Sequence, residues 1–421
     1  MTLRLIQASL LLVVAACGAP ASTSAQSGQS GNSASESERP FTVTEVMKFD
    51  APWAMDFLPG SGLPVTSAAL VTEKEGRLLL VNVATGDREE VAGAPSVVAQ
   101  GQGGLLDVVA APSFAGDGMI YLTFSEASSN GGAQLALARA RLVMGGHPRL
   151  ENLQVIWRNP TGGRGGHYGA RIAFAPDGQS LFLSAGERQR FTPAQDMSLP
   201  MGKILHLTLD GKPAGDNPWA GKTGAASVQV TDPPEDSEAA KTAPSRTVKW
   251  PGTNLTPAET WTLGHRNPLG LAFAPDGRLW EVEMGPRGGD ELNLIVRGRN
   301  YGYPHVSNGD NYNGVPIPDH KPGDGFESPK VYWNPSVSPG GFIIYTGHKF
   351  PQWKGDALVA ALSGQALIRV DIDGDKAKKA EQWDMKARIR AVDQGPDGSV
   401  YLLEDGEAPG QGRLLRLDPA R

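Results

Sequence analysis

A short sequence motif, which we call the recurring phrase, sets the pattern of hydrophobic and polar positions along much of the chain. It reads FAPDGQSLFLSAGE from Phe174, FAPDGRLWEVEMGP from Phe273 and QGPDGSVYLLEDGE from Gln394, with a looser copy, APSFAGDGMIYLTFSE, from Ala111. In each copy a tight turn precedes a run of four to six mainly apolar residues, and a polar or glycine-rich corner follows. This pattern predicts a β-turn that leads into a buried strand.

Two further stretches keep the strand pattern without the Pro-Asp-Gly turn, GSGLPVTSAALVTEKEGRLLLV from Gly60 and FPQWKGDALVAALSGQALIRV from Phe350, which makes six units at irregular spacing. Helical periodicity is absent, because even AKKAEQWDMKARIR, from Ala377, has charges at helical spacing but no apolar stripe. Short repeated β-units with variable loops predict an all-β fold, a six-bladed β-propeller of four-stranded antiparallel blades around a central channel. A pair of β-sandwiches would explain the turns but not the recurrence of one phrase.

The first residues have the pattern of an export signal. Arg4 precedes an apolar run over residues 5–16, which is too short to span a bilayer as a helix. The run ends in Val-Ala-Ala-Cys, which resembles a bacterial lipobox. Residues 1–17 are therefore predicted to be a lipoprotein signal peptide, with Cys17 lipidated as the new N-terminus. In the alternative, an ordinary signal peptide is cleaved near Ala25 and Cys17 is discarded.

The protein is predicted to be exported under either interpretation of the signal peptide. Gly18, rather than Asp, follows the cysteine, so we expect a periplasmic protein anchored to the outer membrane through Cys17, with no other membrane contact. Residues 18–39 contain no large apolar side chain and are predicted to be a flexible Ser/Gly-rich tether. Residues 40–421 are predicted to form the propeller, with the low-complexity stretch 221–245 as a surface insertion.

Composition excludes some classes of function. The 53 glycines and 33 prolines among 421 residues agree with frequent turns and few long helices. A formal charge of −6 argues against nucleic acid as a partner, because nucleic-acid binding needs a concentrated basic face. Cys17 is the only cysteine, so the chain has no intramolecular disulfide.

Four polar, glycine-rich segments are candidates for chemistry, because propellers carry function on the loops around one end of the channel. They are AQGQGGLLDVV (99–109), GGRGGHYGARIAF (162–174), TWTLGHRNPLGLAF (260–273) and EMGPRGGDELNLIVRGRNYGYP (283–304). Taken alone, His167 is more often a hydrogen-bonded loop histidine, and Arg266 a surface ion pair worth little. Because three of the four segments flank repeat strands, together they indicate a binding site.

These segments, in this order, resemble the soluble aldose sugar dehydrogenases that depend on pyrroloquinoline quinone (PQQ), which are relatives of soluble glucose and sorbosone dehydrogenases. The resemblance runs from about Phe41 to the C-terminus and rests on GQGGLLDVV, GHYGAR, GHRNPLGLAF, GPRGGDELNLI, NYGYP, and RIRAV followed by PDGSVYLLED. That family is a six-bladed propeller, in agreement with the number of repeated units.

The resemblance implies a set of cofactor-binding residues. PQQ is a tricarboxylated ortho-quinone, so its site needs cations for the carboxylates and donors for the quinone oxygens. The positions that match family contacts are Gln102, Arg266, Asn267, Tyr312, Ser363, Gly364, Gln365, Arg388 and Arg390. The i, i+2 spacing of Arg388 and Arg390 points both side chains the same way if the segment is extended. A lysine that the glucose-specific branch has near Ser363 is missing here.

The resemblance also implies a general base and two calcium ions. His167 matches the base that removes the C1 hydroxyl proton of the sugar as hydride leaves C1 for the quinone carbon C5, and an imidazole suits that transfer near neutral pH. One calcium ion would touch the quinone and the carbonyls of Gly285 and Pro286. A second would be held by Glu291 and the carbonyl of Tyr301, and the sequence leaves Asp290 and Glu283 open as further ligands.

The predicted function is therefore PQQ- and calcium-dependent oxidation of aldose sugars at C1 to the lactone, with an unidentified electron acceptor. Two alternatives remain, a non-catalytic sugar-binding propeller and a calcium-dependent sugar lactonase. Broad aldose specificity is expected, because the glucose-specific branch has a tryptophan where this chain has Asn334. Trp333 lies one position earlier, and whether it replaces that tryptophan stays open.

Overall fold

The computed structural model describes residues 33–34, 39–60, 67–233, 241–406 and 408–420. The predicted signal peptide with Cys17 lies outside these ranges, as does most of the predicted tether. Within them, no helix is both long and apolar enough to cross a membrane.

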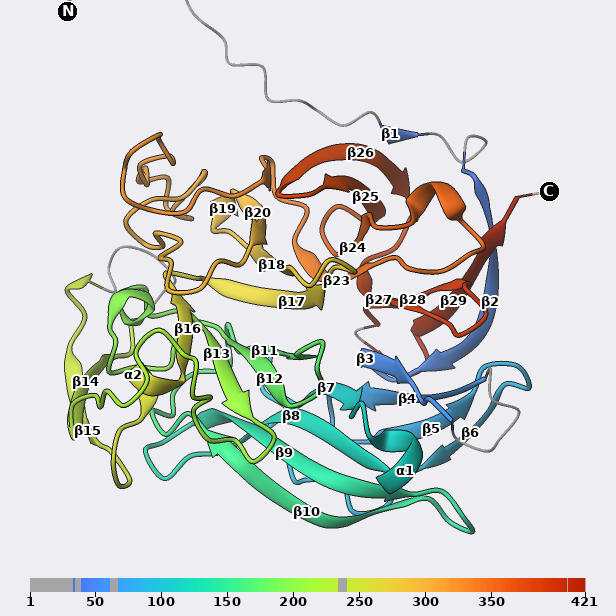
Figure 1. The fold of residues 1–421 in the computed structure, drawn as a ribbon, viewed down its shortest axis with the longest axis horizontal. Helices are drawn as coiled ribbons and strands as arrows, with labels where there is room; N and C mark the ends of the chain where they lie inside the picture. The colour runs from blue at the N-terminus through green and yellow to red at the C-terminus, as the bar shows by residue number, and fades with distance from the viewer. Residues whose placement is uncertain (1–32, 35–38, 61–66, 234–240, 407, 421) are drawn as a thin grey trace, which may run out of the picture. The chain divides into compact units, whose positions relative to one another are not determined.

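The described chain forms six antiparallel sheets around a central axis (Figure 1). The innermost strands are β3 (Pro52–Phe57), β7 (Leu105–Ala110), β11 (Gly169–Phe174), β17 (Asn267–Phe273), β23 (Pro339–Ile344) and β27 (Ile389–Gln394). The second strands are β4 (Ala68–Glu73), β8 (Met119–Ala127), β12 (Ser180–Ala185), β18 (Leu279–Met284), β24 (Ala357–Ala361) and β28 (Val400–Glu404). The innermost strands contact one another in succession, and β27 contacts β3, which closes the ring. The predicted six-bladed propeller is confirmed.

The outer half of each blade completes its four strands. The third strands are β5 (Leu78–Asn82), β9 (Ala133–Val143), β13 (Lys203–Thr208), β20 (Asp290–Leu294), β25 (Ala366–Asp373) and β29 (Gly412–Pro419). The outermost strands are β6 (Asp87–Glu90), β10 (Arg149–Arg158), β16 (Thr260–Leu263), β22 (Val331–Trp333), β26 (Lys376–Asp384) and β2 (Phe41–Phe49). The sixth blade joins the two ends of the propeller, because β2 pairs antiparallel with β29 from Phe41–Pro419 to Phe49–Gly412.

The three Pro-Asp-Gly copies of the recurring phrase form the same hairpin, the turn between the innermost and the second strand of the third, fourth and sixth blades. In the three Pro-Asp-Gly copies the glycine has a positive φ, 69° at Gly178, 84° at Gly277 and 81° at Gly398. Each of these glycines donates its N–H to the carbonyl three residues earlier, at 2.8, 2.9 and 2.8 Å. Glycine adopts this conformation without steric cost, which is why one short phrase recurs in blades whose loops differ.

The hydrophobic core lies between the blades. One apolar cluster occupies each of the six interfaces between neighbouring blades, for example Trp280 and Phe342 between the fourth and fifth. Second strands are covered on both faces, so β4 (AALVTE) and β24 (ALVAA) are buried throughout. Burial on both faces explains why the sequences of these strands are mostly continuous apolar runs and do not alternate between apolar and polar residues.

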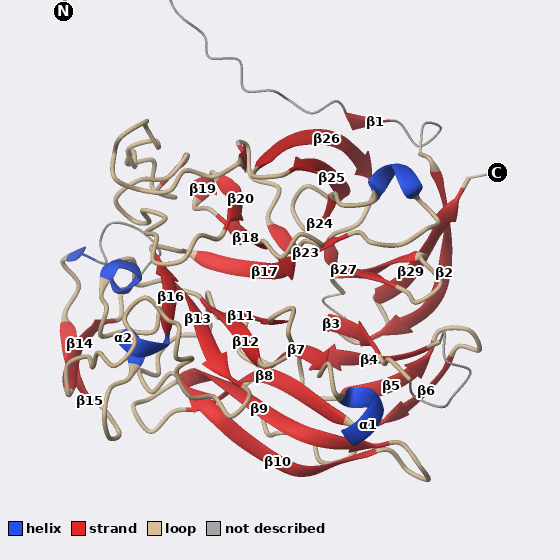
Figure 2. Ribbon diagram, viewed as in Figure 1, coloured by secondary structure: helices blue, strands red, loops and turns tan. Residues whose placement is uncertain are grey.

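The remaining elements are short (Figure 2). β1 (Ser33–Ala34) pairs in parallel with β26 and adds a fifth strand to the sheet of the fifth blade. The strands β14 (Ser227–Thr231), β15 (Ser245–Lys249), β19 (Arg287–Gly288) and β21 (Gly309–Asp310) lie outside the blades in two two-stranded sheets. The helices are α1 (Phe114–Asp117), η2 (Thr192–Gln195), α2 (Thr256–Glu259) and η4 (Pro351–Trp353). β14 and β15 form a hairpin within the connection from β13 to β16, on either side of residues 234–240. The charged segment without an apolar stripe, residues 377–390, forms most of β26, and its last two residues begin β27.

Candidate active site

All six blades contribute to one cavity at the propeller axis, with a volume of about 230 Å³. Its lining consists of Trp53, Lys74, Gln102, Tyr168, Gly169, Asn267, Leu269, Met284, Ser338, Leu362, Arg388 and Arg390. Four of these residues, Gln102, Asn267, Arg388 and Arg390, were predicted to contact the cofactor. We refer to this space as the axial cavity.

The axial cavity has a surplus of positive charge. Arg388 Nε donates to Asp405 Oδ2 at 3.0 Å, and Arg390 Nε and Nη2 donate to Asp405 Oδ1 at 3.0 and 2.8 Å. Burial raises the pKa of Asp405, but the two arginines outweigh burial and leave that pKa below its ordinary value. Lys74, whose Nζ donates to the Gly101 carbonyl at 3.0 Å, adds a third cation to the lining. Three cations facing one carboxylate fit an anionic ligand such as a tricarboxylated quinone.

The predicted base, His167, lies at the edge of this cavity, between the lining residues Gln102 and Tyr168. Its side chain is buried, and its backbone N–H donates to Gln102 Oε1 at 2.8 Å. The ring is oriented by Glu187, because His167 Nδ1 lies 2.5 Å from Glu187 Oε1. A backbone φ of 42° at His167 shows that the loop holds the residue in a conformation that side chains rarely adopt.

Glu187 is a fully buried carboxylate that the surrounding loop keeps ionised. Its Oε2 accepts hydrogen bonds from the backbone N–H groups of Arg190 and Phe191. Burial raises the pKa of Glu187, but the hydrogen bond and charge of His167 and the charge of Arg266 bring it below the ordinary value. A ring that donates Nδ1–H to this carboxylate leaves Nε2 as the nitrogen that can exchange a proton with a ligand, the arrangement of an oriented general base.

The loop before β17 places Arg266 and Asn267 in different surroundings. Asn267 lines the axial cavity, and its Oδ1 accepts the N–H of Gly169 at 3.2 Å. Arg266 is buried beside the axial cavity, and its Nη1 donates to the carbonyl of Gly285 at 2.6 Å. Gly285 was predicted to bind calcium, so in this structure the guanidinium contacts one of the expected ligand oxygens. Pro286 is buried next to it.

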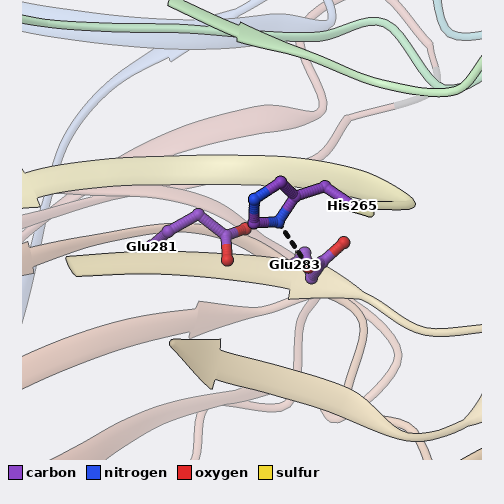
Figure 3. A group of neighbouring side chains, drawn as sticks. All are labelled: His265, Glu281 and Glu283. Atoms are coloured by element: carbon purple, nitrogen blue, oxygen red, sulfur yellow. Dashed lines mark hydrogen bonds and ion pairs between the residues drawn. The ribbon is translucent and has the colours of Figure 1, made fainter. Parts of the chain in front are cut away.

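A group of buried acidic side chains lies in the fourth blade (Figure 3). His265, Glu281 and Glu283 offer ligand atoms that all lie within 4.8 Å of one another. Glu291 is close to them, because the Asn293 amide donates to Glu281 Oε2 at 3.0 Å, to Glu291 Oε2 at 3.2 Å and to Glu283 Oε1 at 3.4 Å. Burial and the charge of Glu283 raise the pKa values of Glu281 and Glu291 well above their ordinary range.

This acidic group fits a hard cation. A small cavity of about 10 Å³, roughly the space of one water-sized body, is lined by Arg266, Glu283, Gly285, Glu291 and Tyr301 among others. Glu281 Oε1 and Asn293 Oδ1 are buried without a hydrogen-bond partner among the described residues. Carboxylate and carbonyl oxygens are the ligands that calcium prefers. The structure thus brings the predicted Glu291 and Tyr301 together with Glu283, which the sequence left open.

The other predicted residues lie around the same end of the propeller. Tyr312 is 57% exposed, and its ring centroid is 5.7 Å from the Arg266 guanidinium carbon. The turn between β24 and β25 holds Ser363, Gly364 and Gln365, and Ser363 Oγ donates to the Oγ of the lining residue Ser338 at 2.8 Å. Ser363, Gly364 and Gln365 themselves do not line the axial cavity.

The open question about Trp333 is resolved by its burial. Trp333 packs in the cluster between the fourth and fifth blades and does not line the axial cavity. The neighbouring Asn334 is exposed, and its amide donates to the carbonyl of Asn308 at 3.2 Å. Trp333 therefore does not supply an aromatic side chain to this cavity.

Sequence reasoning missed four residues that the structure brings to the site: Lys74, Glu187, Glu281 and Asp405. Glu187 and Asp405 follow the second strands of their blades, within the polar corners of the recurring phrase. A systematic reading of those corners would have found both. Lys74 lies in the corresponding corner of the first blade, whereas Glu281 lies in a strand and has no such signal.

Comparison with known proteins gives consistent matches. The chain matches the sequence model of the glucose/sorbosone dehydrogenase family over residues 49–230 and 243–416. It is 35% identical to an aldose sugar dehydrogenase of Escherichia coli over 379 residues, which are 88% of this chain and 91% of that protein.

Solved structures agree with the sequence match. The crystal structure of the soluble aldose sugar dehydrogenase from Escherichia coli in its apo form superposes with a TM-score of 0.76 and 34% identity, and covers 90% of this chain and 100% of that one. The PQQ-bound structure of the aldose sugar dehydrogenase from Streptomyces coelicolor superposes with a TM-score of 0.67 and 27% identity, and covers 90% of this chain and 98% of that one.

Proposed function

Because the chain belongs to the glucose/sorbosone dehydrogenase family, an oxidoreductase family, we propose that it oxidises the C1 hydroxyl of aldose sugars to the lactone, with PQQ and calcium as cofactors. The observation that carries this proposal is the buried His167–Glu187 pair at the edge of a cation-lined axial cavity. The PQQ named for the Streptomyces coelicolor relative is consistent with the charge of that cavity.

Different residues of the chain would bind the cofactors and transfer the proton. Lys74, Arg388 and Arg390 would hold the carboxylates of the quinone, and Asn267 offers an amide donor in the same cavity. Glu283, Glu291 and the Tyr301 carbonyl would hold a calcium ion. When bound, PQQ supplies a two-electron acceptor for hydride, and calcium supplies a Lewis acid.

His167 would remove the proton from the C1 hydroxyl through Nε2. Its Nδ1–H is donated to Glu187, so the ring is held in one orientation and the imidazolium that forms faces a carboxylate. With PQQ bound as the hydride acceptor, the C1 hydroxyl would give its proton to His167 and C1 would give up its hydride, which would leave the carbonyl group of the lactone. The electrons then pass to an acceptor protein or dye that the site does not identify.

The test is reconstitution of purified apoprotein with PQQ and Ca²⁺, followed by dye reduction across a panel of aldoses. We expect turnover only when the quinone, calcium and an aldose are all present. Dye reduction that does not depend on added quinone would contradict the proposal. Hydrolysis of a sugar lactone without quinone would support the lactonase alternative instead.

We also propose that the protein is exported and anchored through Cys17, which lies outside the described residues. Acyl chains stabilise membrane attachment by about 0.8 kcal/mol per buried methylene. Cys17→Ser should move the protein from the outer-membrane fraction to the soluble fraction. A wild-type protein that is already soluble and begins near Gln26 would contradict the anchor.

A further inference from the structure

Asp290 connects the loop that holds the predicted calcium ligands Gly285 and Pro286 to the fifth-blade wall of the axial cavity. It is the first residue of β20, and its side chain is fully buried. The sequence left Asp290 open as a calcium ligand. In the structure its two oxygens accept four hydrogen bonds, which come from two separate segments of the chain.

One carboxylate oxygen holds the loop of residues 285–289, between β18 and β20. Asp290 Oδ1 accepts the N–H of Gly285 at 2.9 Å. The carbonyl of the same peptide unit belongs to Met284, and it accepts a hydrogen bond from Arg266 Nη1 at 3.2 Å. The peptide between Met284 and Gly285 is therefore fixed on both sides. It directly precedes the two carbonyls that are predicted to bind calcium.

The other carboxylate oxygen holds the segment that leads into β23. Asp290 Oδ2 accepts the N–H groups of Val337 and Ser338, both at 2.7 Å. It also accepts the hydroxyl of Ser336 at 2.6 Å. Ser338 has a φ of 51°, a conformation that side chains rarely adopt and that persists only where the surroundings hold it. Asp290 supplies that support.

The same segment forms part of the wall of the axial cavity. Ser338 lines the cavity, and its Oγ accepts a hydrogen bond from Ser363 Oγ at 2.8 Å. Leu362, which also lines the cavity, donates its N–H to the Ser338 carbonyl at 2.9 Å. Gly364 donates its N–H to the Val337 carbonyl at 3.0 Å. Asp290 thus holds the segment against which Ser363 and Gly364, two predicted cofactor contacts, are packed.

The position of Asp290 requires a carboxylate. All four of its partners are donors, and an ionised carboxylate offers only acceptors. Burial raises the pKa of Asp290, and the four hydrogen bonds oppose this rise. An asparagine has the same shape but would place an NH₂ group against at least one of the donors.

We propose that Asp290 is a positioning residue that couples calcium binding in the fourth blade to the cofactor-binding wall of the fifth blade. A cation held by the 285–289 loop, or by Glu291, the next residue of β20, would restrict Asp290 and, through Oδ2, the segment 336–338. This inference rests on the proposed function, because the coupling affects the reaction only if calcium and the quinone both bind.

The binding test uses Asp290→Asn. Its side-chain oxygen should stay with the three donors of residues 336–338, so its NH₂ group would face the Gly285 N–H and that hydrogen bond would be lost. Calorimetry gives the Kd of PQQ for the apoprotein in calcium and in chelator. Wild type should bind PQQ about 5–150-fold more tightly in calcium, the usual range for coupled sites. This ratio should be about threefold to tenfold smaller in Asp290→Asn, the effect of one lost hydrogen bond.

The matched control is Asp356→Asn. Asp356 is buried in the fifth blade, is paired with Arg369 and does not line the axial cavity. This variant should lower the melting temperature and leave the ratio of the two PQQ Kd values unchanged. If Asp290→Asn weakens PQQ binding equally in calcium and in chelator, its role is structural and the proposed coupling is wrong.

Hydrogen exchange tests the same link without PQQ. Addition of Ca²⁺ to the wild-type apoprotein should slow amide exchange in the peptide that contains Val337 and Ser338, and it should not do so in Asp290→Asn. Exchange in wild type that does not respond to calcium would overturn the link between the blades. A response that is present in wild type and lost in Asp290→Asn, without PQQ binding to either protein, would overturn the proposed cofactor and leave the link.

Discussion

Two buried histidine–glutamate pairs lie in neighbouring blades at similar positions and have opposite surroundings. His167 and His265 each lie two residues before an innermost strand. Glu187 lies two residues after the end of the second strand of its blade, and Glu283 is the second-last residue of the second strand of the next blade. In both pairs the histidine Nδ1 faces a carboxylate oxygen, at 2.5 Å in the third blade and 3.0 Å in the fourth. The two pairs are similar but not equivalent in the repeat, because Glu187 is the last residue of FAPDGQSLFLSAGE and Glu283 stands three positions earlier in FAPDGRLWEVEMGP.

The neighbours of each pair determine what it can do. Glu187 faces backbone N–H groups, and its pKa is lowered, whereas Glu283 lies beside Glu281 and Glu291, whose pKa values are raised by burial and by its charge. His265 also shares a hydrogen bond with Thr262 Oγ1 at 2.9 Å through Nε2. One pair thus has the geometry expected of the proposed base, and the other belongs to the group of acidic side chains where we propose that a cation binds. The difference shows that the neighbours of a buried histidine–glutamate pair, and not the pair itself, determine its chemistry.

The largest expected effect separates the two histidines. His167→Ala should lower turnover by about 10²–10⁴-fold, the usual contribution of a positioned general base, while PQQ binding stays close to wild type because the cavity cations remain. Single-turnover reduction of the quinone and a PQQ titration measure both quantities. His265→Ala is the matched comparison and should lower thermal stability more than His167→Ala does. A wild-type rate of quinone reduction in His167→Ala would show that the base lies elsewhere.

Calcium should act on the fourth-blade pair and not on the third-blade pair. Free Ca²⁺ at 100 times its Kd should stabilise the folded protein by about 2.7 kcal/mol, as measured by melting temperature with and without a chelator. Glu283→Gln/Glu291→Gln should lose this increase, and Glu187→Gln should retain it. A melting temperature of wild type that is the same in chelator and in calcium would contradict the metal site.

Glu187→Gln should lower turnover by about 10–100-fold, the range found for carboxylates that orient metal-ligating histidines. Without the negative charge, the imidazolium is less stable, so the acidic limb of the pH–kcat profile should move to lower pH. Glu187→Asp keeps the charge and should restore that limb toward the wild-type position. If Glu187→Gln lowers turnover without moving the limb, Glu187 has only a structural role.

The smallest expected effect concerns the pH dependence of stability. The pKa of Glu281 is raised, so the folded protein keeps a proton that the unfolded chain releases, and metal-free stability should fall as pH rises above the ordinary glutamate range. Glu281→Gln has no proton to lose, so its stability should fall less than that of wild type between pH 5 and pH 8. Urea unfolding in the presence of a chelator at pH 5 and pH 8 measures the free energy of unfolding of both proteins. If this free energy changes equally with pH in wild type and in Glu281→Gln, the protonation of Glu281 is not coupled to folding.

Much of the fold can be predicted from the sequence, because its signals are local. A Pro-Asp-Gly turn needs a glycine at positive φ within a few residues, as at Gly178, Gly277 and Gly398, and strands covered on both faces need apolar runs. The direction of Arg388 and Arg390 could also be predicted locally, because side chains at i and i+2 of an extended segment point to the same face. In the structure both arginines line the axial cavity. The family resemblance added His167, Gln102 and Asn267, which the structure places together.

Only the tertiary structure decided the partners of these residues. Glu187 reaches His167 from 20 positions away, and Asp405 meets Arg390 from 15, because each lies across a blade on the neighbouring strand or its corner. Lys74 belongs to the first blade and shares a cavity with Arg388 of the sixth only because β2 pairs with β29 and closes the ring. Local patterns determine strands and turns, but distances between side chains from different blades depend on ring closure, which no short stretch of sequence encodes.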